Sequence, residues 1–120
     1  MKRVVTELER FRVLPEKEAV VKEWMDFLNE YLPDVLLTLE QEKMYVEAIF
    51  QEEEQGVTYL YWFSVQGENP VAVEESNFEV DKKHMAYWQE CIDPAYRSKK
   101  LTPKVVMIPE KIHQAIQEDK

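Results

Sequence analysis

Along the chain, apolar residues recur at every second position in some segments and at every third or fourth position in others. Residues 4–13 follow the first spacing, which predicts a β-strand. The two faces of this strand carry Glu9, Phe11 and Val13 on one side and Leu8, Arg10 and Arg12 on the other. From Pro15 the apolar residues follow the helical spacing as far as Pro33, and residues 33–41 have the pattern of a short second helix.

Two strands and a long helix are predicted in the middle of the chain. Residues 43–51 and 57–66 both alternate, and a polar turn over residues 53–56 separates them, which predicts a β-hairpin. Ser76 and Glu79 have the spacing of a capping box, so a helix is expected over residues 76–92. Residues 101–108 then predict a last strand, and residues 109–117 predict a terminal helix.

The predicted order of elements is β-α-β-β-α-β within a single domain, residues 1–120. This order is typical of the ferredoxin-like fold, an α+β fold whose four-stranded antiparallel sheet carries both helices on one face. The strand over residues 57–66 is apolar on both faces, with Tyr59, Tyr61 and Phe63 opposite Leu60 and Trp62. Because two helices cover only one face, we expect the other face to be buried in a homodimer, as in a dimeric α/β barrel.

The composition argues against nucleic-acid and membrane partners and favours a reducing, cytoplasmic compartment. The 120 residues include 24 Asp and Glu against 15 Lys and Arg, and the net charge of −9 opposes binding to nucleic acid. No apolar run is long enough to span a membrane, and residues 1–10 are charged where a secretory signal would be apolar, which predicts a cytoplasmic protein without membrane contact. Cys91 is the only cysteine, which fits a reducing compartment and excludes a thiolate metal cluster.

Several segments carry a family resemblance: Arg10-Phe11-Arg12-Val13, Glu42-Lys43-Met44-Tyr45-Val46-Glu47, Tyr61-Trp62, Asp81-Lys82-Lys83-His84, Tyr87-Trp88, Glu90-Cys91-Ile92-Asp93-Pro94, Leu101-Thr102-Pro103 and Val105-Val106-Met107-Ile108-Pro109. Together they resemble an uncharacterised bacterial family that is catalogued as a domain of unknown function, and the resemblance covers nearly the whole chain. The stretch Phe11-Arg12-Val13-Leu14-Pro15-Glu16-Lys17 is similar to the Val-x-Pro-Gly-Lys entry of the dimeric α/β-barrel superfamily, with Glu16 in place of the glycine.

Resemblance to that superfamily implies a pocket between the second long helix and the sheet. The superfamily includes haem-degrading monooxygenases, cofactor-free quinone-forming monooxygenases, dye-decolourising peroxidases and small isomerases, and a shared fold does not choose among them. In the haem-degrading members a helix histidine, to which His84 is similar, ligates iron beside an asparagine and a tryptophan. Trp62 loosely matches that tryptophan, whereas Glu9 takes the approximate place of the asparagine. Because a carboxylate does not reproduce the neutral hydrogen bond of the amide, Glu9 argues against haem. We expect no cofactor.

His84 is the strongest candidate for catalysis. It shares the inward face of the helix predicted over residues 76–92 with Trp88 and Cys91, and an imidazole titrates near neutral pH. Glu9 would be a carboxylate facing an apolar core, which makes it a candidate general base. The alternatives are structural: His84 is hydrogen-bonded in the core to Glu9 or a tyrosine, and Glu9 is solvated at the open end of its strand.

Aromatic and charged side chains supply candidate ligand contacts. Trp62, Tyr61 and Trp88 suit the walls of a pocket for a flat organic molecule. A second set is expected on the opposite face of the sheet, toward the dimer interior, and comprises Arg10, Arg12 and Glu47. These charged groups would bind an acidic ligand or form ion pairs at the interface.

Two functions from different classes follow from these features. The first is a homodimeric small-molecule-binding protein with monooxygenase-like or acid–base activity centred on His84. The second is a non-catalytic dimeric binding or regulatory module in which His84 is structural. In both, Cys91 lies on an apolar helix face and is expected to be a small buried hydrophobe.

Overall fold

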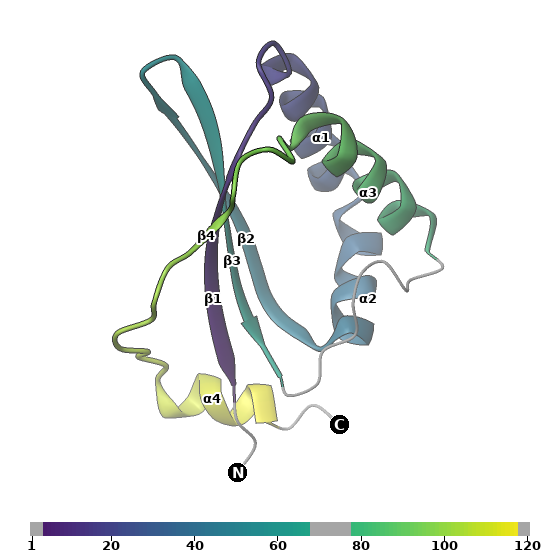
Figure 1. Ribbon diagram of the computed structural model, residues 1–120. Coiled ribbons are helices and arrows are strands. Elements are labelled where there is room, and N and C mark those ends of the chain that lie inside the picture. The colour runs from purple at the N-terminus through teal and green to yellow at the C-terminus, as the bar shows by residue number, and fades with distance from the viewer. Residues whose placement is uncertain (1–3, 68–77, 118–120) are drawn as a thin grey trace.

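The computed structural model describes residues 4–67 and 78–117 and has the predicted α+β class. Its elements, in chain order, are β1 (Val5–Arg12), α1 (Glu18–Glu30), α2 (Leu32–Glu42), β2 (Met44–Glu54), β3 (Val57–Gln66), α3 (Glu79–Cys91), β4 (Lys99–Lys100) and α4 (Glu110–Gln117). The four strands form one antiparallel sheet in the order β2-β3-β1-β4. Figure 1 shows α1, α2 and α3 along one face of the sheet, whereas α4 lies near the start of β1.

The hairpin of β2 and β3 confirms the predicted alternation and determines which side chains face the helices. Glu47 and Ile49 of β2 lie opposite Ser64 and Trp62 of β3. Trp62 packs against the helix-side core, so its neighbours in this register share that face. The turn between the strands has Gln55 and Gly56 at positive φ, 52° and 79°, which is typical of a two-residue hairpin connection.

The helix predicted up to Pro33 is α1, and α2 follows it almost without a break. α1 ends at Glu30 and is capped by Tyr31, whose backbone N–H bonds to the carbonyl of Phe27, and α2 begins at Leu32. Pro33 lies in the first turn of α2, where its missing N–H costs no helical hydrogen bond. The short helix predicted over residues 33–41 is therefore confirmed, and Pro33 begins it rather than simply ending the helix before.

The strand predicted over residues 101–108 is wrong, because only Lys99 and Lys100 pair with β1. The backbone N–H of Leu101 still bonds to the carbonyl of Leu8, and Pro103 then offers no N–H with which to continue the ladder. Val105, Val106 and Met107 beyond it are exposed, with Met107 82% accessible. The predicted terminal helix is confirmed as α4, whereas Ser76 of the predicted capping box lies outside the described residues.

The core lies between the sheet and α1 and α3, around Trp24. Trp24, Leu60 and Cys91 are fully inaccessible to solvent. Trp24 stacks nearly parallel to Tyr87 of α3 and approaches Trp62 of β3 with ring centroids 5.7 Å apart. Among the described residues, no helix is both long and apolar enough to cross a membrane.

Candidate functional site

His84 lies half-buried on α3 and accepts a hydrogen bond from α1. The indole Nε1 of Trp24 donates to Nδ1 of His84 at 3.0 Å, so the partner is Trp24 rather than the predicted Glu9 or a tyrosine. Because an indole N–H can only donate, Nδ1 must be unprotonated, and the neutral ring carries its hydrogen on Nε2. Burial lowers the pKa of His84, and the charge of Asp81 offsets this only in part. His84 is therefore a neutral imidazole of fixed tautomer at pH 7.

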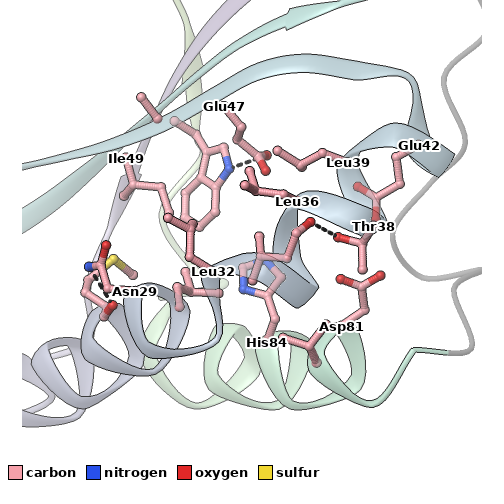
Figure 2. Close-up of a pocket in the computed structure, with 16 residues that line it drawn as sticks. Asn29, Leu32, Leu36, Thr38, Leu39, Glu42, Glu47, Ile49, Asp81 and His84 are labelled. Atoms are coloured by element: carbon pink, nitrogen blue, oxygen red, sulfur yellow. Dashed lines mark hydrogen bonds between the residues drawn. The ribbon is translucent and has the colours of Figure 1, made fainter.

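Two neighbouring cavities meet at His84, Trp62 and Glu47, which line both of them. We call the first the α2 pocket, because α2 supplies one of its walls; its volume is about 310 Å³. Its apolar lining includes Leu28, Leu32, Leu36, Leu39, Ile49 and Trp62. Its polar lining includes Thr38, Glu42, Glu47, Asp81 and His84 (Figure 2). An apolar wall with a few grouped polar atoms is the common composition of a small-molecule site.

Glu47 faces the helices, so its predicted place on the face of Arg10 and Arg12 is wrong. The register with β3 places Glu47 beside the helix-facing Ser64, and Trp62 Nε1 donates to Glu47 Oε2 at 2.8 Å. Burial is the main influence that raises the pKa of Glu47; the Trp62 hydrogen bond lowers it, and the charge of Asp81 raises it further. Glu47 is consequently an acidic group of raised pKa at the solvent-exposed rim of the α2 pocket.

Asp81 lines the α2 pocket, although its place in the sequence predicted no role at a site. Its side chain rises from α3 toward Thr38 of α2 (Figure 2), and the residue is 6% exposed. Oδ2 of Asp81 is inaccessible and has no hydrogen-bond partner among the described residues. The spacing of Asp81 and His84, three apart on a predicted helix, was a signal that both share one face.

The second cavity, which we call the β1 pocket, has a volume of about 260 Å³ and contains the other predicted site residues of the inner face. Glu9, Phe11 and Trp88 line it together with His84 and Trp62, so the four residues His84, Glu9, Trp62 and Trp88 that the sequence grouped lie around this one pocket. Glu9 Oε2 accepts a hydrogen bond of 2.6 Å from Ser98 Oγ. Glu9 is thus neither fully solvated nor the partner of His84.

Arg10 and Tyr61 lie on the opposite, open face of the sheet and line neither of these pockets. The Arg10 guanidinium stands 3.6 Å from the ring centroid of Tyr59, and its Nη2 lies 3.4 Å from Glu54 Oε1. Tyr61 Oη donates to Glu52 at 2.7 Å. The predicted set of ligand contacts is therefore divided between two faces of the sheet.

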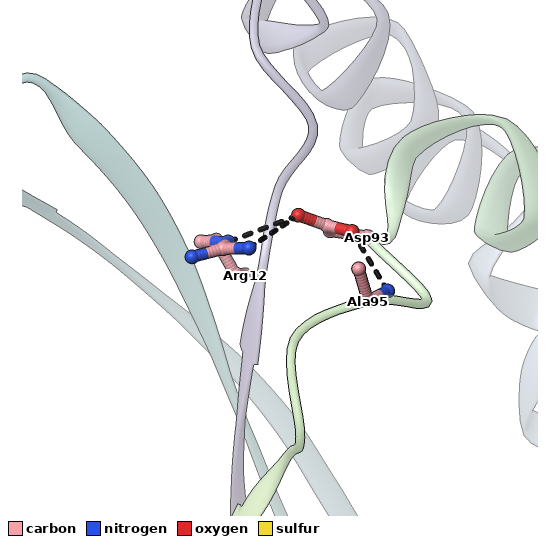
Figure 3. Close-up of polar contacts among 3 residues, drawn as sticks. All are labelled: Arg12, Asp93 and Ala95. Carbon is pink, nitrogen blue, oxygen red and sulfur yellow. Dashed lines mark hydrogen bonds and ion pairs between the residues drawn. The ribbon is translucent and has the colours of Figure 1, made fainter.

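Arg12 ties β1 to the segment that follows α3. Its Nε and Nη2 donate to Oδ2 of Asp93 at 3.0 and 2.7 Å, and Asp93 Oδ1 accepts from the backbone N–H of Ala95 at 2.9 Å (Figure 3). The pKa of Asp93 is lowered, first by the Arg12 hydrogen bonds and then by that of Ala95. This ion pair holds together segments 81 residues apart in the sequence.

Acid should weaken the fold through this ion pair. A carboxyl group whose folded pKa is depressed contributes stability above its unfolded pKa, about 3.9, and loses it as the pH falls through the folded value. We expect Asp93→Asn to be less stable than the wild type at pH 7, with a difference that shrinks at pH 3. Urea unfolding at both pH values measures this, and Asp26→Asn, at a surface ion pair with Lys22, is the matched control. An equal loss at both pH values would show that the charge of Asp93 is unimportant.

Cys91 and Tyr87 lie in the packed core, away from both pockets. Cys91 is a fully buried free thiol, as expected. Tyr87 is buried between α3 and α1, and its Oη donates to Glu23 of α1 at 2.8 Å. Among residues 4–67 and 78–117, no three histidine, cysteine or acidic side chains are grouped to hold a metal ion.

Comparison with known families matches residues 4–114 to the model described as "Family of unknown function (DUF6176)". No curated protein matches the chain. The family description names no substrate, cofactor or reaction, so the chemistry of the two pockets is the available guide to what the protein does.

Proposed function

Because the chain belongs to the DUF6176 family of unknown function, we propose its role from its own geometry: it binds a small organic molecule in the α2 pocket. The observation that carries this proposal is the pocket itself, about 310 Å³ in volume, which lies between α2, α3 and the sheet. Its size is at the lower end of the usual range for ligand sites. Leu28, Leu36 and Leu39 would supply the contact area, and the grouped polar side chains would orient the ligand.

The surroundings of His84 favour binding over acid–base catalysis. A general base must gain a proton, and Nε2 of the neutral ring already carries one. Protonation at Nδ1 would replace the Trp24 hydrogen bond with two N–H groups facing each other at 3.0 Å. Burial of His84 also disfavours its charged form. Of the two functions that the sequence suggests, these contacts support the non-catalytic binding module, with His84 as a fixed hydrogen-bond donor.

Blocking the α2 pocket should abolish ligand binding without unfolding the protein. Leu36 lines the pocket and is 51% exposed, so a tryptophan there can enter the cavity at little cost to the core. We expect Leu36→Trp to lose the small apolar fragments that the wild type binds in a ligand-observed NMR screen. Leu37→Trp is the matched control, because Leu37 is 55% exposed on the same helix and is not among the residues that line the pocket. Equal binding by both variants would place the ligand elsewhere.

We further propose that the protein forms a homodimer through the open face of a ferredoxin-like sheet, as in the dimeric α/β barrels. The order β2-β3-β1-β4 and the exposed Phe50 on the open face support this arrangement. A second support is Glu16, which takes the place of glycine in the superfamily entry motif: its φ of 68° is in the left-handed region that glycine adopts most easily.

Light scattering at micromolar concentration tests the dimer. The wild type should have twice the mass of one chain, and Phe50→Glu should shift the mass toward the monomer, because a charge would be buried at the interface. Leu37→Glu places the same charge on an exposed apolar residue of the helix face and should leave the mass unchanged. A monomeric wild type would end the dimer proposal and leave the pocket proposal intact.

A further inference from the structure

The charged side chains that line the α2 pocket are all acidic. Glu42, Glu47 and Asp81 come from α2, β2 and α3, and no lysine or arginine is among the described residues that line the cavity. His84, the remaining titratable lining group, is neutral, because burial lowers its pKa. The whole chain carries a net charge of −9, which draws cations toward it at long range.

One of these carboxylates is buried without a partner for its inner oxygen. Asp81 is 6% exposed, lines the pocket, and has an inaccessible Oδ2 that no described residue hydrogen-bonds. Thr38, which Asp81 approaches in Figure 2, donates its hydroxyl hydrogen to the carbonyl of Val35 at 2.7 Å instead. A buried carboxylate oxygen that lacks a donor is costly, so Asp81 is set to receive a donor from outside the described fold.

The opposite wall adds a second carboxylate and an aromatic ring. Glu47 accepts a hydrogen bond from Trp62 Nε1 at Oε2 and lines the same pocket as Asp81, so the like charges of the two carboxylates repel each other across it. A positive charge in this space would relieve that repulsion, and the Trp62 ring is a favourable surface for a cation. The leucines of α1 and α2 would hold the apolar part of the same molecule.

We propose that the α2 pocket takes a small apolar amine, whose ammonium group donates to Asp81 and lies near Glu47 while its hydrocarbon part contacts Leu28, Leu36 and Leu39. The inference rests on the proposed binding function and specifies its ligand class. The ammonium would donate to Asp81 and place a positive charge beside Asp81 and Glu47, in a described lining that contains no lysine or arginine. A ligand with a carboxylate or phosphate would add to the repulsion.

Calorimetric titration of the full chain with three matched probes tests this inference. The probes are 2-phenylethylamine, 2-phenylethanol and phenylacetate, which share a ring and differ in the charge of the terminal group. Because a hydrogen bond to a charged group adds about 1.5–3 kcal/mol, we expect the amine to bind at least about tenfold more tightly than the alcohol, and phenylacetate to bind most weakly. Asp81→Asn should reduce amine affinity about tenfold or more and leave alcohol affinity unchanged.

Asp26→Asn is the control, because it removes the same charge from an exposed site on α1 and should change neither affinity. If the alcohol or phenylacetate binds as tightly as the amine, and Leu36→Trp removes that binding, the proposed pocket stands and the amine inference is wrong. If none of the three probes binds, the amine inference also fails, and the fragment screen with Leu36→Trp and Leu37→Trp decides separately whether the pocket binds anything.

Discussion

Replacing Trp24 by alanine should lower the free energy of unfolding by about 3–5 kcal/mol, the usual cost of removing a large buried aromatic side chain. Trp24 is fully buried, and its ring contacts Trp62, Tyr87 and Trp88 in the centre of the core. The change also leaves Nδ1 of His84 without its donor. Chemical denaturation followed by circular dichroism measures the loss, which is a large part of the 5–15 kcal/mol typical of a domain.

Trp24→Phe separates packing from hydrogen bonding at this position. Phenylalanine keeps most of the aromatic contacts but cannot donate to His84, so we expect a smaller loss of about 2 kcal/mol. Leu37→Ala, at an exposed residue of α2, should cost less than about 0.5 kcal/mol. A loss below about 1 kcal/mol for Trp24→Ala would mean that α1 does not pack on the sheet through Trp24.

Cys91 should react with iodoacetamide at least about 100-fold more slowly in the native protein than in the unfolded chain. Burial is the main cause that raises the pKa of the thiol from 9.0 to about 11, which reduces the reactive thiolate at pH 8 about 100-fold. The residue is also fully inaccessible, so alkylation requires local or global opening. Because Cys91 is the only cysteine, mass spectrometry of the intact chain measures the rate directly.

The same reaction serves as a check on the Trp24 variants. Both Cys91 and Trp24 belong to the core that joins α1 and α3, so Trp24→Ala should raise the native labelling rate toward that of the unfolded chain. The wild type in guanidinium chloride gives the upper limit of the rate. Native labelling within tenfold of that limit would show that the thiol is accessible and that its role as a buried hydrophobe is wrong.

Much of the fold follows from local patterns of the chain. The alternation over residues 57–66 predicts β3 with the same boundaries, and the helical spacing before Cys91 predicts α3 to within one residue at its end. The faces of β1 also follow, because successive side chains of a strand point to opposite sides: Phe11 contacts Trp88 in the core, and Arg12 lies on the other face with Tyr96.

The candidate site is predictable in part for the same reason. His84 and Trp88 are four residues apart on a helix, so one face presents both, and each lines the β1 pocket. Trp62 also follows from its place on an apolar strand face. The α2 wall of the α2 pocket could not be predicted from the sequence. The spacing of Leu32 and Leu36 indicates an apolar helix face, but both residues are exposed, and the spacing does not show what that face covers.

By itself, then, the sequence determined the α+β class, the order of most elements and the faces of the strands, since these depend on periodicity within a few residues of chain. Only the tertiary structure decided the rest. The register of β2 against β3 turned Glu47 toward the helices, and the hydrogen bond from Trp24 to His84 joins residues 60 apart in the chain. The last strand is Lys99–Lys100 rather than residues 101–108, because extended backbone becomes a strand only where a neighbour can pair with it. Such contacts depend on which segments meet in space, and the spacing of residues along the chain does not contain that information.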